Sequence, residues 1–235
     1  LNRADLLIYQ GLELEIGWLP LLLEGARNPK IMPGQLGHLD LSRGVLPREV
    51  PEGSVDRAQG DIHPLGNPHY PLDPKNGVLM AIAIMERLEI MDSENLNAYR
   101  KNLQDFLLRL QKKIPEWHSR MKPFQGEPVV TYHQTWAYFL KEFNIKRAGT
   151  IERNPGIPPS PKHLTFLAQT MNREKVKVIL QANYFESEFS DLLAEKTGAR
   201  VLKLPVSVGG VPGVENYIDL FDHLVSKLEE AFAQD

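Results

Sequence analysis

The sequence has no cysteine among its 235 residues. A chain without thiols forms no disulfide bridge, has no thiol nucleophile and cannot bind zinc through cysteine. The longest uninterrupted apolar run, Val78–Met85, is far shorter than the roughly 20 residues that a membrane-spanning helix needs. A basic excess is also lacking, since 27 lysines and arginines stand against 30 aspartates and glutamates. The composition therefore argues against a disulfide scaffold, a transmembrane protein and a nucleic-acid binder.

What the sequence does contain is typical of a packed α/β protein. Hydrophobic residues make up 42% of the chain, and its length allows one large domain or two smaller lobes. Residues 4–9 are largely apolar and lead to Gly11, which predicts a buried parallel strand. Residues 27–72 are rich in glycine, proline and aspartate and lack a helical period, which predicts loops with at most one short strand. Loops of this length are more often functional than idle.

Two helices are predicted in the middle of the chain. The first begins at Asp73-Pro74, because aspartate caps a helix and proline fits its first position. The first turns of residues 78–91 are apolar on nearly all sides, which predicts that this helix is buried on most faces. The second helix has about 25 residues, and Pro115 is expected to kink it or to end its regular part. Its apolar stripe consists of Leu96, Tyr99, Leu103, Phe106, Leu107, Leu110, Ile114, Trp117 and Met121.

Beyond Gly126 the pattern alternates between strands and helices. The predicted strands are residues 129–132, 145–151, 176–180 and 200–204. Strands that alternate with helices form βαβ units with a parallel sheet. The last part of the chain is therefore predicted to be an α/β lobe.

Three histidines are candidate metal ligands. His133 directly follows the predicted strand 129–132, at the edge where open parallel sheets bind ligands. His69 lies in a loop that two prolines stiffen, and His63, six residues earlier, could join the same cluster. Imidazoles on such loops suit a borderline ion such as zinc. The alternative is that His133 packs at its strand end and His69 is an exposed side chain.

Enzyme motifs do not accompany these histidines. The sequence contains neither GxSxG nor His-Glu-x-x-His, and Gly209–Gly213 lacks the spacing of a phosphate-binding loop. The remaining histidines of interest, His38, His118 and His223, are expected to be structural or to face solvent.

Four stretches resemble the solute-binding proteins of zinc and manganese ABC importers, a family often called TroA-like. LNRADLLIYQG at residues 1–11 is similar to the family's ADLVIYNG strand, and NPHYPLDPKN at 67–76 to its DPHVWLDPxN stretch. Residues 99–110 resemble the start of the family's linking helix, and HQTWAYF at 133–139 is similar to HxAFxYFAxxYG. The similarity keeps its order over essentially the whole chain.

The resemblance implies a fold of two α/β lobes with parallel sheets flanked by helices, joined by one long rigid helix. The N-terminal lobe would comprise residues 1–93, the linking helix 94–122 and the C-terminal lobe 123–235. One metal ion would lie in the cleft between the lobes, because His69 and His133 fall on two of the family's metal-binding histidines.

The same resemblance implies a function in transport. The protein would be extracytoplasmic, either periplasmic or lipid-anchored, and would not be an enzyme. It would capture zinc, or less favourably manganese, and deliver the ion to the membrane permease of an ABC importer. A monomer is expected, because no feature of the sequence argues for an oligomer.

The chain departs from the family pattern at its expected ligands. The family's first histidine lies upstream of the ADLVIYNG strand, so the displayed chain is expected to lack the first strand of that lobe and one ligand. Family carboxylates would fall at about Ala182 and Pro205, which cannot bind metal through their side chains. A mainly imidazole site favours zinc over manganese, with His63 or a water completing the coordination. Affinity is expected to fall below about pH 6, as imidazoles take up protons.

Two other functions stay open at this point. A metal-dependent hydrolase would use His63, His69 and His133 with an acidic base such as Asp61. A solute-binding protein whose metal site has decayed would bind an organic ligand or none, which the missing carboxylates allow.

Overall fold

A computed structural model describes residues 1–53, 60 and 63–233 of the chain. Clustering of their contacts gives two compact units. The first is built from residues within Leu1–Ser54 and His63–Gln111, and the second mainly from Lys112–Asp235. In the described part of the chain, no helix is both long enough and apolar enough to cross a membrane.

The first unit contains a small parallel sheet with helices around it. Its elements are β1 (Leu7–Tyr9), α1 (Leu19–Ala26), β2 (His38–Asp40), α2 (Pro74–Met91) and the first part of α3 (Leu96–Met121), with 3₁₀ turns at Pro29–Ile31, Leu41–Gly44, Tyr70–Leu72 and Ser93–Asn95. β1 pairs with β2 in parallel, Leu7 opposite His38, and the strand is shorter than the predicted 4–9. Leu19 and Leu23 of α1 pack with Ile31 into a buried cluster against this sheet.

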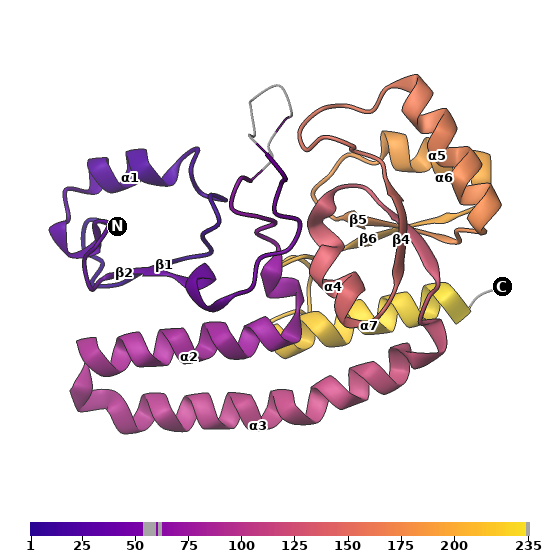
Figure 1. Cartoon of the computed structure of the whole chain (residues 1–235). Helices are drawn as coiled ribbons and strands as arrows, with labels where there is room; N and C mark the ends of the chain where they lie inside the picture. The colour runs from indigo at the N-terminus through magenta and orange to yellow at the C-terminus, as the bar shows by residue number, and fades with distance from the viewer. Residues whose placement is uncertain (54–59, 61–62, 234–235) are drawn as a thin grey trace. The chain divides into compact units, whose positions relative to one another are not determined.

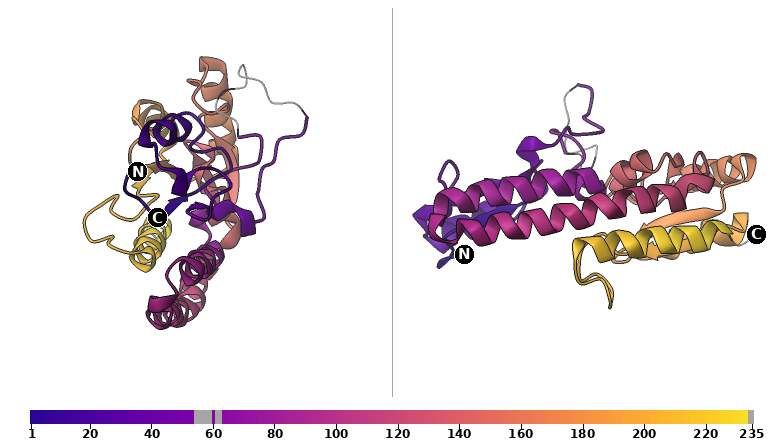
Figure 2. Two further views of the ribbon diagram at one scale, coloured as in Figure 1. Left: turned by 90° about the vertical axis from the view of Figure 1, so that its left-hand side faces the viewer. Right: turned by 90° about the horizontal axis from the view of Figure 1, so that it is seen from below.

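Helix α2 begins as the sequence predicts but is less buried than expected. The Asp73 carboxylate accepts a hydrogen bond from the Lys75 amide at 2.9 Å, and Pro74 occupies the first helical position. The prediction of burial on most faces is wrong, because Leu79 is 39% exposed and Ile90 65% exposed. The run Val78–Met85 has no charged residue, but a lack of charge does not provide elements that cover the helix. Figures 1 and 2 show α2 side by side with the first part of α3.

Helix α3 confirms the predicted long helix and continues through Pro115. It has 26 residues, so the proline does not end it. Proline removes one backbone donor, but side chains on both sides of this position are anchored to α7 (Tyr217–Ala233). Lys113 Nζ and Trp117 Nε1 both donate to Asp222 Oδ1, at 3.0 and 2.7 Å. These contacts anchor the helix to α7 on both sides of the position where its own hydrogen bonding is weakest.

The second unit is a four-stranded parallel sheet covered on both faces. Its elements are β3 (Pro128–Thr131), α4 (Ala137–Glu142), β4 (Lys146–Thr150), α5 (Pro161–Glu174), β5 (Val178–Ala182), α6 (Glu188–Thr197), β6 (Arg200–Leu204) and α7, with 3₁₀ turns at Lys122–Phe124 and Gln134–Trp136. The strand order is β4-β3-β5-β6, and every neighbouring pair is parallel. Figure 1 shows α5 and α6 on one side of this sheet and α4 and α7 on the other. The predicted α/β architecture of this region is confirmed.

Aromatic side chains form the centre of the face that α4 and α7 cover. Phe221 of α7 is fully buried and stacks on Trp117 with ring centroids 5.1 Å apart. It also lies 6.2 Å from the ring of Phe139 on α4. One side chain therefore joins α3, α4 and α7.

Replacing Phe221 should destabilise the second unit. Phe221→Ala is expected to lower the free energy of unfolding by about 3–5 kcal/mol, because it leaves a cavity among buried rings. The control is Phe166→Ala, which removes a side chain that is 60% exposed and should change stability by roughly 0.5 kcal/mol or less. Urea unfolding followed by tryptophan fluorescence measures both variants. Equal losses for the two would contradict this packing account.

Candidate metal centre

His133 lies at the carboxyl edge of the second unit's sheet, where the sequence predicts it. The ladder of backbone hydrogen bonds continues past the strand ends at this edge. The amide of Ile151 donates to the Thr131 carbonyl and that of Glu152 to the Tyr132 carbonyl, each at 2.8 Å. β3 and β4 therefore leave the sheet in register, and His133 and Glu152 emerge as neighbours from adjacent strands.

The side chains of His133 and Glu152 are joined by a short hydrogen bond. Nδ1 of His133 lies 2.6 Å from Oε2 of Glu152. The two side chains are only 15% and 10% exposed, so water screens this contact weakly. The ring of Phe185 lies 5.7 Å from the imidazole and itself stacks on Tyr132 at 4.7 Å. A carboxylate on one side and an aromatic wall on the other thus fix the orientation of the imidazole ring.

Glu152 supplies a carboxylate at an edge where two expected positions have none. β5 ends at Ala182, which is 1% exposed, and the buried Pro205 directly follows β6. Acidic groups nevertheless influence this edge. The pKa of Tyr132 is raised, first by burial and then by the negative charges of Glu152, Glu186 and Glu188.

His69 lies in the first unit and is held by Asn67. Oδ1 of Asn67 accepts a hydrogen bond of 2.9 Å from the His69 backbone amide. The same oxygen lies 2.9 Å from Nδ1 of the His69 imidazole. The amide nitrogen of the same Asn67 donates to Oε2 of Glu49 at 2.8 Å. Asn67 is only 5% exposed. A chain of three polar side chains, with the buried Asn67 at its centre, therefore orients the His69 ring.

The loop that carries His69 is tied to the end of β1. The Tyr70 hydroxyl donates to the Gln10 carbonyl at 2.6 Å. The side-chain amide of Gln10 in turn donates to the Pro68 carbonyl. The side chain of Asn76, in the first turn of α2, donates to the Tyr70 carbonyl at 3.0 Å. The position of His69 is thus set by a strand end and a helix start together.

The structure does not bring His63 into a metal cluster. Its carbonyl accepts a hydrogen bond from Gly66 at 3.0 Å, and its side chain is half-buried in the first unit. Across the described residues, no three or more His, Asp and Glu side chains are close enough to hold a metal ion. The roles of His63, His69 and His133 as ligands stay predictions, and Asp61 lies outside the described residues.

Two of the other histidines, His38 and His118, have structural partners, in agreement with the expectation from the sequence. His38 contacts the Ile31 carbonyl at 2.8 Å through Nδ1 and the Tyr9 hydroxyl at 3.0 Å through Nε2. His118 contacts Oε1 of Glu142 at 2.8 Å through Nε2.

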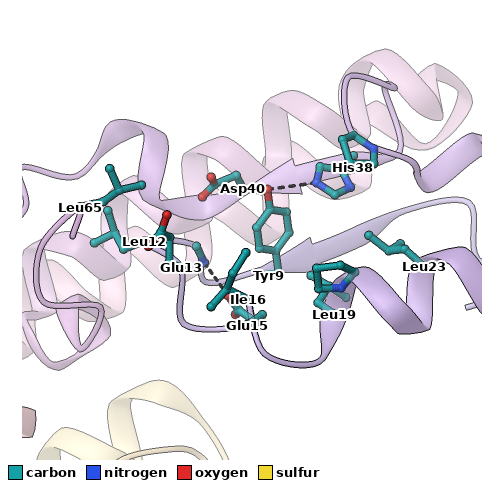
Figure 3. A pocket seen from close by; sticks show the side chains of 13 residues that line it. Tyr9, Leu12, Glu13, Glu15, Ile16, Leu19, Leu23, His38, Asp40 and Leu65 are labelled. Carbon is teal, nitrogen blue, oxygen red and sulfur yellow. Dashed lines mark hydrogen bonds between the residues drawn. The ribbon is translucent and has the colours of Figure 1, made fainter. Parts of the chain in front are cut away.

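A separate pocket of about 330 Å³ lies in the first unit, and neither His69 nor His133 lines it. Figure 3 shows Tyr9, His38 and Asp40 on its polar side and leucines such as Leu19 opposite. The pKa of Tyr9 is raised, mainly by burial and by the charge of Asp40. The buried Glu15 is used by the fold, since its carboxylate accepts the amides of Gln10 and Gly11.

Sequence reasoning missed the partners of both histidines. Glu152 is the first residue beyond the predicted strand 145–151, so its place at the ligand-binding edge was available from the pattern. Asn67 lies two residues before His69, a spacing at which asparagine often bonds to nearby backbone. Glu49 gave no signal, because 18 residues separate it from Asn67.

Comparison with known proteins identifies the family of the chain. The family model "Zinc-uptake complex component A periplasmic" matches residues 1–231. The chain belongs to this family.

Characterised members of the zinc-uptake component A family and their relatives are distant in sequence. The chain is 24% identical over 242 residues to the metal ABC transporter substrate-binding lipoprotein ScbA of Streptococcus cristatus, covering 99% of this chain and 74% of that protein. It is 25% identical over 167 residues to the high-affinity zinc uptake system protein ZnuA of Brucella suis, covering 71% of this chain and 50% of that protein. The manganese ABC transporter substrate-binding lipoprotein PsaA of Streptococcus mitis is 23% identical, with 99% and 74% covered.

Solved structures show the same fold. A ZnuA deletion mutant with zinc bound aligns with a TM-score of 0.77 at 21% identity, over 100% of this chain and 81% of that one. The laminin-binding adhesin Lmb of Streptococcus agalactiae aligns with a TM-score of 0.78 at 20% identity, over 98% and 81%. These matches confirm the predicted fold class. The family and its relatives also confirm the metal-transport assignment and the extracytoplasmic location, while their names include both zinc and manganese.

Proposed function

We propose that the protein captures zinc in preference to manganese and delivers it to the membrane permease of an ABC importer. It acts as a monomer and catalyses no reaction. His69 and His133 are ligands of the ion, and His63 or a water completes the coordination. The observation that carries the proposal is the hydrogen bond of 2.6 Å between His133 and Glu152 at the ligand-binding edge of the sheet.

The surroundings of the two histidines support a metal-binding role. In a histidine that binds a metal, the N–H of the other ring nitrogen usually donates to a carboxylate or carbonyl oxygen. This hydrogen bond fixes the tautomer and the orientation of the ring. His133 has such a partner in Glu152, and His69 has one in the amide oxygen of Asn67. Other histidines of the chain also have partners, so the location at a strand end and in the NPH stretch singles these two out.

The preference for zinc follows from the donors that the chain offers. Manganese prefers carboxylate and carbonyl oxygens, whereas imidazole suits zinc. Ala182 and Pro205 offer no side-chain oxygen at two strand ends of the second unit. Glu152 supplies a carboxylate at the same edge, but it is bonded to the imidazole of His133. A nitrogen-rich site is the expected result.

Zinc binding should depend on each of the two histidines. In a titration against a chromophoric chelator, the wild-type chain is expected to bind one zinc ion tightly. His69→Ala and His133→Ala should each weaken binding by at least about 100-fold, because each removes a direct ligand. His223→Ala is the matched control, since His223 lies on α7 and should leave affinity unchanged. Wild-type affinity in the His133→Ala variant would refute the proposed site.

Zinc should also stabilise the folded chain. At a free zinc concentration 100 times the dissociation constant, binding adds about 2.7 kcal/mol to the free energy of unfolding. The melting temperature should therefore rise on adding zinc and fall back when a chelator is added. A melting temperature that does not change on adding zinc would favour a solute-binding protein whose metal site has decayed. Zinc-dependent turnover of a generic ester or phosphate substrate would favour the hydrolase.

A further inference from the structure

We propose that Asn67 and Glu152 are positioning residues that hold His69 and His133 in one tautomer. In this tautomer the hydrogen is on Nδ1, and both histidines present Nε2 to the metal. The inference rests on the proposed function, because it concerns the same two histidines. It adds which nitrogen binds the ion and which side chains determine that choice.

The contact of Glu152 assigns the tautomer of His133. An ionised carboxylate can only accept hydrogen bonds, so the Nδ1 that lies 2.6 Å from its Oε2 must be the donor. A neutral imidazole carries one ring hydrogen, which leaves the lone pair on Nε2. Metals bind the nitrogen that carries the lone pair, and a carboxylate on the other nitrogen makes the ring a stronger ligand.

The same geometry argues against Glu152 as a direct ligand of that ion. Its Oε2 lies on the Nδ1 side of the ring, whereas an ion bound to Nε2 lies on the opposite side. Glu152 cannot keep its hydrogen bond of 2.6 Å and also reach such an ion. It therefore acts through His133.

The tautomer of His69 is assigned by a longer chain of reasoning. Oε2 of Glu49 can only accept, so the group of Asn67 that faces it at 2.8 Å must be the amide nitrogen. The amide oxygen of Asn67 then faces His69, where it accepts the backbone amide at 2.9 Å and lies 2.9 Å from Nδ1. Nδ1 is again the donor. Glu49 thus sets the amide of Asn67, which sets the ring of His69.

One other histidine–carboxylate pair of the second unit has the opposite connectivity. His118 contacts Glu142 through Nε2 at 2.8 Å, and the Glu142 side chain is 7% exposed against 10% for that of Glu152. A histidine–glutamate contact in this protein does not in itself select Nδ1. The pair of His118 and Glu142 therefore provides a control with the same chemistry on the other nitrogen.

The test combines tautomer assignment with zinc affinity. Long-range ¹⁵N–¹H NMR of the metal-free chain, above the reference imidazole pKa of about 6.5, should show Nδ1–H for both His69 and His133. In Glu152→Ala, His133 should no longer be held in the Nδ1–H tautomer, and zinc binding should weaken by about 10–100-fold. Glu152→Gln keeps an acceptor oxygen and should restore the tautomer and most of the affinity. Glu142→Ala should change neither property.

The arm for His69 uses a charge exchange. Asn67→Ala removes the acceptor and should weaken zinc binding by about 10–100-fold. In the double variant Glu49→Gln with Asn67→Asp, one carboxylate oxygen of residue 67 still faces Nδ1 of His69. The other carboxylate oxygen accepts from the new amide at position 49. This variant should therefore bind zinc within a few-fold of wild type. This variant also tests the idea if Asn67→Ala fails to fold, because loss of the Nδ1–H tautomer in it would contradict the proposal.

The outcomes separate this inference from the proposed function. If His133→Ala weakens zinc binding while Glu152→Ala retains both the Nδ1–H tautomer and wild-type affinity, the positioning role is wrong and the binding function stands. If neither His69→Ala nor His133→Ala weakens binding, the proposed function fails, and a correct tautomer in the metal-free chain would not rescue it.

Discussion

The backbone hydrogen bond from the Glu152 amide to the Tyr132 carbonyl determines which side chains meet at the carboxyl edge of the second unit's sheet. It extends the pairing of β3 and β4 beyond their last residues, so that the side chains of His133 and Glu152 leave the sheet side by side. The register then places the Glu152 carboxylate at 2.6 Å from His133 Nδ1. A shift of one residue would turn one of the two side chains to the opposite face of the sheet and separate them.

The first unit reaches a similar result by local means. Asn67 and His69 belong to one turn, and the turn is anchored by Tyr70 to the end of β1. Here the orientation of the ring depends on one amide group whose two ends are distinguished by Glu49. The two units therefore prepare their histidines with different chemistry, a neutral amide in one and a carboxylate in the other.

Much of the fold could be predicted from the sequence, because it depends on local periodicity. The apolar stripe of α3 and the alternation of strands and helices after Gly126 both appear in the structure at nearly the expected residues. The failure concerns context. The sequence predicts an α2 that is buried on most faces, but the exposure of Ile90 depends on which elements cover α2. Pro115 does not end α3, and Trp117 close to it is anchored to α7.

The candidate site shows the same division. His133 could be placed from the strand that precedes it, and His69 from its prolines and cap. The place of Glu152 at the end of its strand was available from the sequence, but its hydrogen bond with His133 depends on strand register, which no local pattern encodes. The place of Asn67 two residues before His69 is a local signal, whereas its contact with Glu49 is not. The identity of the metal is harder still to predict from the sequence, because it depends on all the donor atoms that surround the ion.

X-ray absorption spectroscopy of the zinc-loaded protein tests the central claim most directly. The account predicts at least two imidazole nitrogens at about 2.0–2.1 Å from zinc, with one fewer after His133→Ala. A first shell composed of oxygen alone, or an imidazole count that His133→Ala leaves unchanged, would contradict it.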